Sequence, residues 1–484
     1  MVEGGTISGV GSSFVDQVYM TGAATYSQME MTVLNEFLHT LGTMTTNTNF
    51  VLNVAETAVY NLNAASSLSL ARTSTTNKGQ IVVFGVFNFT SSPDITVSLD
   101  FINRATTDFW IGKTSFIGVY QNYKNLTINP LASVIATSTH AVGTNYGRFV
   151  FYGDLEFATS SSFTNICPGK FLLNQPGSLV LTGGSFDNQC DVSFDCPTTL
   201  TITSGSLIFN DDVYICNLVM GVTGQAAATS TLTNQKSLVS HNITMFSGTI
   251  TSVEHVDVLR TFTWNAGTIT GSGYFYVHQF FEMVTTGTKT LTSSISIVNL
   301  FSGEWIAGQL SPSHTSQIVN AENATFVQWD TLCSTSDTAS FVNDGLFLKR
   351  GTGTATNRWQ FINYGNVFVE QGTLKLARDV HNYGYNYLHE DTVLLLLDNT
   401  AITYNRYFYE NSTVEGPGSL IGQRGHAHFS GFLNITGEFR SGPATSGSYP
   451  PHFYFYPTVL FSDLMIEQTH LTIRSSGRST CINL

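Results

Sequence analysis

Two adjacent acids in the phrase Asn210-Asp211-Asp212 are the residues whose types and spacing best suit acid–base chemistry. Paired carboxylates can hold a water or share a proton during hydrolysis of a glycosidic bond. The same phrase also suits a solvated β-turn, because Asn and Asp side chains hydrogen-bond their own backbone in turns. We favour the turn, so the sequence predicts no catalytic residue here.

Two histidines in the phrase His426-Ala-His428 would project from one face of a strand, at a spacing that suits a metal ion. A third ligand is not close in the sequence, although Glu415 or Asp463 could approach in the fold. The phrase Glu254-His255-Val-Asp257 offers a similar group. Stacked surface histidines explain both phrases, so we expect no metal site and no cofactor.

Other catalytic signatures are missing from the sequence. It contains no Gly-x-Ser-x-Gly elbow, phosphate-binding loop, His-Glu-x-x-His helix or dinucleotide-binding fingerprint. Because catalysis lacks a motif, we do not expect an enzyme.

Four of the six cysteines lie close together in the sequence and are candidates for disulfides: Cys167, Cys190, Cys196 and Cys216. An even number of clustered cysteines favours disulfides in an oxidising compartment. Free buried thiols and a zinc site are the alternatives. Zinc fits less well, because no pair of cysteines has the Cys-x-x-Cys spacing that is typical of zinc ligands.

Six asparagines begin the Asn-x-Ser/Thr acceptor sequence for N-linked glycans: Asn88, Asn125, Asn242, Asn323, Asn411 and Asn434. We expect N-linked glycans if the protein passes through a eukaryotic secretory route. Asn323 and Asn411 are best placed, because they lie in polar turns. Asn88 is least suited, since it stands between Phe87 and Phe89.

The composition is acidic and poor in charge, with 20 Lys and Arg against 33 Asp and Glu, and charged residues make up 11% of the chain. Nucleic acid is therefore not an expected partner, since the longest basic run is Lys349-Arg350. No apolar stretch is long enough to span a membrane. Met1-Val-Glu-Gly-Gly lacks the apolar core of a signal peptide, so we expect the chain to be the processed or ordered part of a longer protein.

A repeating scaffold must position these residues. One short phrase occurs three times, with a period of about 20 residues that is typical of a solenoid: Phe341-Val-Asn-Asp-Gly345, Phe361-Ile-Asn-Tyr-Gly365 and Val380-His-Asn-Tyr-Gly384. Each copy reads as a strand, a corner and a second strand. We predict an all-β fold, a right-handed parallel β-helix, in preference to a β-sandwich with chance similarity between hairpins.

Coils of such a fold stack at about 4.8 Å, so equivalent residues should lie in columns. Phe341 and Phe361 should stack inside. One column should be a hydrogen-bonded asparagine ladder: Asn343, Asn363 and Asn382. A second should take positive φ at the corner: Gly345, Gly365 and Gly384. A third should face the core: Leu348, Phe368 and Tyr387.

Related phrases extend the repeat along the chain. Gly5-Thr-Ile-Ser-Gly recurs as Gly267-Thr-Ile-Thr-Gly, and Trp264-Asn-Ala-Gly recurs as Trp305-Ile-Ala-Gly. We predict three regions: an irregular β-rich N-terminal part that begins with a coil-like segment (residues 1–164), a regular parallel β-helix (165–440) and a C-terminal strand or assembly segment (441–484).

Residues 26–42 leave helix and strand open. A capping box at Ser27 and Glu30 and a terminating Gly42 favour a helix. Alternating apolar residues at Met29, Met31 and Val33 favour a strand instead.

The Trp-x-Ala-Gly-x-Ile-x-Gly-x-Gly and Phe-x-Asn-x-Gly phrases resemble the Gly-rich parallel β-helix repeats of secreted surface and adhesin-like proteins from protists, algae and bacteria. The resemblance covers residues 165–440 and 4–14. It implies a β-solenoid and an extracellular or cell-surface location, in a class that includes adhesins, cell-wall proteins and fibre subunits. Asn210-Asp211-Asp212 also resembles one element of the pectin-hydrolase active site, but the other phrases of that family are absent.

The function most consistent with these features is that of a structural extracellular glycoprotein, a β-solenoid that forms a surface fibre or adhesin-like stalk. Its expected partner is a second copy of the chain, bound head to tail by stacking of end coils or exchange of the C-terminal strand. Caps outside the chain, or residues 26–42 folded back as a cap, would prevent this. A cell-surface polysaccharide is a further possible partner, and the alternative function is a carbohydrate-active β-helix enzyme or a carbohydrate-binding protein.

Overall fold

The computed structural model describes the whole chain except residues 4, 42, 47–49, 64–67, 73–78, 91–93, 137–140, 159–160, 175–177, 191, 195, 197, 224–229, 335–337, 397–403, 424, 443–450, 457–458, 467–469, 474–479 and 482–484. The chain divides into two compact units, unit 1 (Met1–Thr223 and Ala227–Ser240) and unit 2 (Gly224–Ala226 and His241–Leu484). The boundary falls within the region predicted as one regular β-helix, and β24 (Ser237–Met245) runs across it in the sequence.

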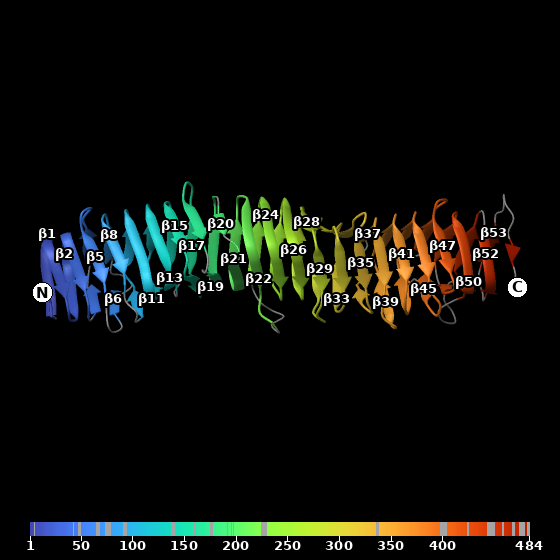
Figure 1. The fold of residues 1–484 in the computed structure, drawn as a ribbon, viewed down its shortest axis with the longest axis horizontal. Helices are drawn as coiled ribbons and strands as arrows, with labels where there is room; N and C mark the ends of the chain where they lie inside the picture. Colours follow the sequence, from blue (N-terminus) through green and yellow to red (C-terminus); the bar gives the residue numbers. More distant parts are fainter. Residues whose placement is uncertain are drawn as a thin grey trace. The chain divides into compact units, whose positions relative to one another are not determined.

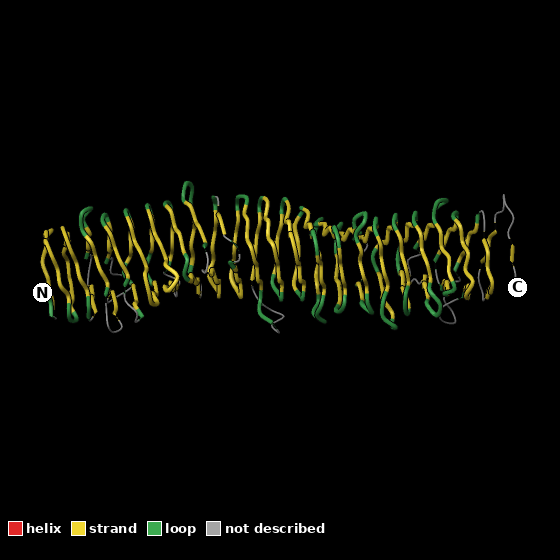
Figure 2. The backbone as a smooth tube through the Cα atoms, viewed as in Figure 1, coloured by secondary structure: helices red, strands yellow, loops and turns green. Residues whose placement is uncertain are grey.

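Both units are built from parallel β-coils (Figure 1). Figure 2 shows strands joined by loops, and the described residues contain no helix. A typical coil adds one strand to each of three stacks of parallel strands, and the longest strands bend from one stack into the next. The prediction of an all-β parallel solenoid is confirmed.

In unit 1, β1 (Gly5–Met20) pairs with β2 (Ala24–His39), and β2 pairs with the first strand of each stack. Stack A contains β4 (Val51–Val54), β7 (Gln80–Val83), β10 (Asp100–Asn103), β12 (Tyr120–Asn122), β14 (Val142–Asn145), β17 (Ser162–Asn165), β19 (Ser178–Asn188), β21 (Thr199–Phe209) and β23 (Ser230–Asn234). Stack B contains β5 (Val59–Leu62), β8 (Val86–Phe89), β11 (Thr106–Phe116), β13 (Asn125–Ala136), β15 (Arg148–Phe151), β18 (Lys170–Leu173), β20 (Val192–Phe194) and β22 (Val213–Met220). Stack C contains four whole strands, β3 (Thr43–Thr46), β6 (Leu68–Arg72), β9 (Ile95–Val97) and β16 (Asp154–Ala158). It also contains the second parts of β11, β13 and β22 and the first parts of β19 and β21.

In unit 2, stack D contains β25 (Thr249–Ser252), β27 (Gly267–Gly271), β30 (Lys289–Leu291), β33 (Gln309–Pro312), β36 (Leu332–Cys333), β39 (Thr354–Asn357), β42 (Thr373–Leu376), β45 (Val393–Leu396), β48 (Ser419–Gly422) and parts of β50 (Phe432–Ser441) and β52 (Val459–Ile466). Stack E contains the first part of β26 (His255–Trp264), β28 (Tyr274–Val277), β31 (Ser296–Asn299), β34 (Gln317–Asn320), β37 (Ser340–Asn343), β40 (Gln360–Asn363), β43 (Val380–Asn382), β46 (Asn405–Phe408), β49 (His426–Phe429), β51 (His452–Phe455) and β53 (His470–Ile473). Stack F contains the second part of β26, β29 (Phe280–Met283), β32 (Ser302–Trp305), β35 (Thr325–Gln328), β38 (Leu346–Lys349), β41 (Asn366–Val369), β44 (Tyr385–Leu388), β47 (Thr413–Gly416), parts of β50 and β52, and β54 (Thr480–Cys481).

Strand alternation builds the core, because every second side chain of a strand points into the coil. In unit 1 the rings of Phe37, Tyr60 and Phe87 stack on successive coils, with 4.3 Å between neighbouring centroids. In unit 2 the buried rings of Phe341 and Phe361 lie 5.6 Å apart with an interplanar angle of 3°. The predicted stacking of these two rings is confirmed.

The asparagine ladder of unit 2 is also confirmed, and it is longer than the sequence phrase indicated. Four side-chain hydrogen bonds of 2.7–2.8 Å, each from the amide of one Asn to the side-chain oxygen of the next, join a run of five: Asn299, Asn320, Asn343, Asn363 and Asn382. All five side chains are buried at the end of a stack E strand. Their amides therefore satisfy one another where water has no access.

A second ladder of the same kind lies in stack A of unit 1, and the sequence analysis missed it. Its side-chain hydrogen bonds are all 2.7 Å long and join Asn103, Asn122, Asn145, Asn165 and Asn188. Each rung follows an apolar-x-Asn pattern such as Phe101-Ile-Asn103 or Phe163-Thr-Asn165, with Gly143-Thr-Asn145 as the exception. That pattern was the signal that could have revealed it.

The corner glycines are needed for a reason other than the predicted one. Gly345, Gly365 and Gly384 are not among the residues with positive φ. A Cβ on Gly365 would lie only 2.1 Å from the carbonyl oxygen of Gly345, and one on Gly384 only 2.0 Å from that of Gly365. Glycine is required here because the corner backbones stack closely, and not because the backbone adopts a positive φ.

The column of Leu348, Phe368 and Tyr387 exists, but it does not point into the core as predicted, although Leu348 itself is buried. These residues are in register on neighbouring coils. Phe368 and Tyr387 are partly exposed, whereas Phe347 and Val367 beside them are buried and point inward. Alternation continues through the glycine corner, so the inward set is displaced by one residue from our expectation.

Residues 26–42, left open between helix and strand, belong mainly to β2. Glu30 and Val33 pair in register with Ser12 and Val15 of β1, and Met31 pairs with Leu52 of β4. Pairing on both edges satisfies the backbone of this segment, which overrides the local capping signal of a helix.

Candidate functional site

One outer surface of unit 2 concentrates aromatic and imidazole side chains, and we call it the tyrosine–histidine face. It comprises Tyr364, Tyr383, Tyr409, His381, Tyr407, His428, Tyr454, His426 and His452. These residues occupy the outward positions of β43, β46, β49 and β51 or the corners that follow stack E strands. The inward positions of the same strands hold the core, so alternation alone projects this set outward.

Parallel register arranges the face in columns. His381, Tyr407, His428 and Tyr454 are direct partners on four successive coils. The ring of His428 lies 5.0 Å from that of Tyr407 and 4.5 Å from that of Tyr454, nearly parallel to both. The column is a continuous stack, because each ring packs its face on its neighbours.

A second column consists of Tyr364, Tyr383 and Tyr409, which lie at the corner after stack E. Ring centroids are 4.8 Å apart for the first pair and 4.1 Å apart for the second, at interplanar angles of 9° and 3°. Tyr364 and Tyr383 directly follow ladder residues Asn363 and Asn382. The phrase Asn-Tyr-Gly thus places an amide inside, a phenol outside and a glycine at the closely packed corner.

The two columns are joined by a hydrogen bond of 3.0 Å between His381 Nδ1 and the Tyr409 hydroxyl. Burial, followed by the hydrogen bond to Tyr383, raises the pKa of Tyr409 to about 12. Burial lowers the pKa of His381 below its usual value, against a smaller opposing effect of Asp379. The phenol therefore keeps its proton near neutral pH, while the imidazole is mainly neutral.

His426 and His428 lie on one face of β49, as predicted, and the His426 ring lies 4.8 Å from that of His452, at a tilt of 38°. Burial, followed by the nearby His426, lowers the pKa of His428. The proposed third ligands are on other stacks: Glu415 accepts a hydrogen bond from Tyr385 in stack F, and Asp463 is in register with Glu438 in stack D. Among the described residues, these histidines belong to no group of three potential ligands close enough for one metal ion.

The acids of Asn210-Asp211-Asp212 form a turn. Asp211 accepts a hydrogen bond from the Asp212 amide, and Asp212 accepts one from the Ser237 amide. Asn210 donates to the Asp187 carboxylate. These carboxylates fix local backbone, which is the structural role expected of a turn.

The phrase Glu254-His255-Val-Asp257 likewise forms surface pairs. Asp257 lies 3.5 Å from His255 Nε2 and 3.0 Å from His278 Nε2 on the next coil. All three side chains are partly exposed to solvent. Exposed pairs of this kind contribute little to stability and form no closed site.

Glu282 and Glu304 form a pair of acids on neighbouring coils that the sequence analysis did not single out. They are direct partners on neighbouring coils of stack F. Glu304 accepts a 2.7 Å hydrogen bond from the Trp329 indole, and Glu282 accepts one from Thr263. In-register neighbours project in the same direction, whereas glycosidases place two carboxylates on opposite sides of the scissile bond. The arrangement therefore suits hydrogen bonding better than hydrolysis.

The four candidate cysteines form two disulfides, Cys167–Cys190 and Cys196–Cys216. Each joins neighbouring coils of unit 1, at sequence separations of 23 and 20 residues. Cys333 is a free buried thiol, and burial raises its pKa far above the usual value. It is therefore an unreactive thiol of the core.

The six predicted glycan acceptors all lie on the outside of the coils. Asn125, Asn323 and Asn411 are exposed, while Asn88, Asn242 and Asn434 are partly exposed. Asn88 points outward between two buried phenylalanines and donates a hydrogen bond to Asn61. Asn88 is therefore more accessible than we expected from its position between Phe87 and Phe89.

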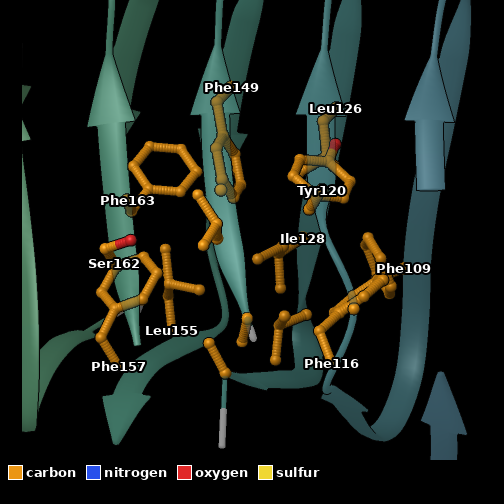
Figure 3. Close-up of a pocket in the computed structure, with 16 residues that line it drawn as sticks. Phe109, Phe116, Tyr120, Leu126, Ile128, Phe149, Leu155, Phe157, Ser162 and Phe163 are labelled. Carbon is orange, nitrogen blue, oxygen red and sulfur yellow. The ribbon is translucent and has the colours of Figure 1, made fainter. Parts of the chain in front are cut away.

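A cavity of about 40 Å³ lies inside the coils of unit 1 (Figure 3). Aromatic and aliphatic side chains line it, among them Phe109, Phe116, Phe149, Leu155 and Phe163. No acid, base or cysteine is among its lining residues. An apolar cavity of this size is a packing defect of the core rather than a site for chemistry.

Comparison of the chain with protein-family models, with curated proteins and with solved structures gave no match. The described part of the chain has no helix that is long and apolar enough to cross a membrane. The resemblance to Gly-rich β-helix repeat proteins is supported at the level of the parallel solenoid. The tyrosine–histidine face is the most distinctive assembly of side chains on this scaffold.

Proposed function

We propose that the protein is a structural, extracellular β-solenoid that associates head to tail into a surface fibre or adhesin-like stalk. The observation that carries the proposal is the in-register stacking of identical residues on successive coils, as in Asn343, Asn363 and Asn382. Each coil presents the same row of backbone donors and acceptors as the one before it. A second copy could therefore continue the stack, and such a heterologous contact propagates as a filament.

Two further features support this proposal. Disulfides between coils of unit 1 persist in oxidising compartments, which favours an extracellular location. The six glycan acceptors lie on outer surfaces, where an N-linked glycan would not disturb the core. We therefore retain extracellular or cell-surface localisation, N-linked glycans and self-association as parts of one proposal.

Electron microscopy of the purified protein over a range of concentrations tests the assembly. Uniform fibres are expected, with sedimentation that depends on concentration. Phe14 on β1 is a candidate contact residue, since 72% of its surface is exposed. Phe14→Asp should weaken assembly, while Leu131→Asp, at a residue that is 77% exposed on β13, should not. Single particles at every concentration would reject the proposal.

A carbohydrate-active or carbohydrate-binding protein is the second candidate, favoured by one observation. The carboxylates of Glu282 and Glu304 are neighbours in stack F, and the exposed rings of Phe280 and Phe301 flank that column. Cell-surface polysaccharides retained by the protein, with retention lost in Glu282→Gln, would support binding. Hydrolysis that is lost in the same variant would support an enzyme.

A further inference from the structure

The tyrosine stack of unit 2 holds three phenols face to face on neighbouring coils. Backbone register fixes this arrangement. The backbone N–H groups of Tyr364, Tyr383 and Tyr409 each donate a hydrogen bond of 2.7–2.9 Å to the backbone carbonyl oxygen of a ladder asparagine on the preceding coil. Parallel pairing thus holds the rings at 4.8 and 4.1 Å. The spacing is a property of the stacked coils, since each tyrosine is anchored by its own backbone.

The same stack has a proton acceptor in place. Removal of an electron from a phenol makes its hydroxyl a strong acid, so a nearby base speeds the oxidation. His381 Nδ1 lies 3.0 Å from the Tyr409 hydroxyl, within hydrogen-bonding distance. Since burial lowers the pKa of His381, this imidazole is mainly neutral near pH 7 and can take up the proton.

The stack is also accessible from outside. Tyr364 is 55% exposed and Tyr383 is 36% exposed. Tyr409 is less exposed and lies on Tyr383. An external oxidant can therefore reach the outer phenols while the inner one remains in contact with its histidine.

We propose that Tyr364, Tyr383 and Tyr409 form a site of oxidative cross-linking, at which hydrogen peroxide and a haem peroxidase join phenols of neighbouring coils. Each of two phenols loses one electron and one proton to give a phenoxyl radical. The two radicals form a carbon–carbon bond between the positions ortho to oxygen, and the two ring protons there move to the oxygens. One hydrogen peroxide accepts the two electrons and two protons and becomes two waters.

The product is a dityrosine that ties one coil covalently to the next. It would act on unit 2 as the disulfides act on unit 1, by closing a loop between neighbouring coils. Tyr383 and Tyr409 are the favoured pair, because they have the shorter centroid distance and the adjacent histidine.

The test treats dilute full-length protein with horseradish peroxidase and limiting hydrogen peroxide. Expected results are dityrosine fluorescence in protein of monomer mass, loss of two hydrogens from the intact chain, and a cross-linked peptide pair containing Tyr383 and Tyr409. Tyr383→Phe retains the ring but cannot form a phenoxyl radical, so this variant should lose both links of the stack. Tyr364→Phe should retain the link between Tyr383 and Tyr409.

Matched variants in the same corner column distinguish the effect of ring stacking on cross-linking from the effect of solvent exposure alone. Tyr456 occupies this column two coils beyond Tyr409, with Ser430 on the coil between them. Tyr456→Phe should leave the yield unchanged, since the described neighbour of this tyrosine in the column is Ser430. Ser430→Tyr should create new links to Tyr409 and Tyr456. Thermal unfolding of each variant confirms that the coils remain folded.

The contribution of His381 has its own control. Tyr123 and Tyr146 in unit 1 stack at 4.9 Å and 9°, beside Arg104 rather than a histidine. His381→Gln should slow linkage at Tyr409 without changing linkage between Tyr123 and Tyr146. Cross-links that form only between molecules, or a yield at this stack that is unchanged in Tyr383→Phe, would overturn the proposal.

Discussion

The side-chain amide of Asn363 donates a 2.7 Å hydrogen bond to the Oδ1 of Asn382 on the next coil, while Asn363 Oδ1 accepts an equal bond from Asn343. Asn363 is fully buried. Its amide is thus both donor and acceptor in the middle of a ladder that excludes water. This relationship links coil register to stability, because a shift of one residue would break every rung at once.

Asn363→Leu is expected to lower the free energy of unfolding of unit 2 by about 1–3 kcal/mol, the usual cost of leaving buried polar groups without partners. The variant removes one acceptor of the Asn343 amide and the donor to Asn382 Oδ1, while Asn343 still donates to the backbone carbonyl oxygens of Gly345 and Asn366. Chemical denaturation followed by circular dichroism measures the change. Asn366→Leu, at an exposed position of β41, serves as the control and should have a much smaller effect.

Gly365→Ala should destabilise unit 2 although the backbone of Gly365 is not in the positive-φ region. The new Cβ would lie 2.1 Å from the Gly345 carbonyl oxygen, so two stacked corners would have to separate. We expect a loss of about 1–3 kcal/mol, typical of overpacking. Tyr364→Ala, at the exposed neighbouring residue, should cost less, and equal losses would contradict the steric explanation.

The sequence was sufficient for the fold class and for part of the ladder, because both depend on short-range repetition. Phe341-Val-Asn and Phe361-Ile-Asn repeat within about 20 residues, and such a period has few structural interpretations. The ladder of unit 1 was missed because its rungs stand in more varied phrases, among them Tyr120-Gln-Asn122 and Gly143-Thr-Asn145.

The candidate site was less predictable, because its contacts join residues on different coils. His428 meets Tyr407 and Tyr454 only through the register of β46, β49 and β51, and the connecting segments differ in length. The orientation of Leu348 depended on how alternation passes the corner at Gly345, a detail of backbone geometry. The pair of Glu282 and Glu304 required the same register information.

Filling the cavity of unit 1 should stabilise this unit. Ala136 lines the cavity and is buried at the end of β13. Ala136→Val adds two methyl groups to empty apolar space, and we expect a gain of about 0.5–2 kcal/mol. Ala58→Val, at a buried position that does not line the cavity, should be neutral or destabilising. A loss of stability in Ala136→Val would show that the cavity cannot accommodate the larger side chain.

Lys289 should make the stability of unit 2 depend on pH in the alkaline range. Its ammonium group is buried at the first residue of β30 and donates to three carbonyl oxygens, those of Thr285, Gly287 and Ala307. Burial lowers the pKa of Lys289 from 10.5 to about 8. The folded protein thus releases this proton at a lower pH than the unfolded chain.

The sign of the dependence follows from proton counts. Between pH 8 and 10.5 the unfolded chain binds more protons at Lys289 than the folded protein does, so the free energy of unfolding rises with pH across this window. The contribution levels off above the unfolded pKa and amounts to at most about 3 kcal/mol. Lys289→Met removes the titrating group. The difference in the free energy of unfolding between this variant and the unmodified protein therefore separates the contribution of Lys289 from that of other groups that titrate in the same range. Urea denaturation at a series of pH values measures it, with the exposed Lys113→Met as the control that retains the rise. A difference between the unmodified protein and Lys289→Met that stays constant from pH 8 to 10.5 would mean that the carbonyl oxygens hold the ammonium group in its charged form despite burial.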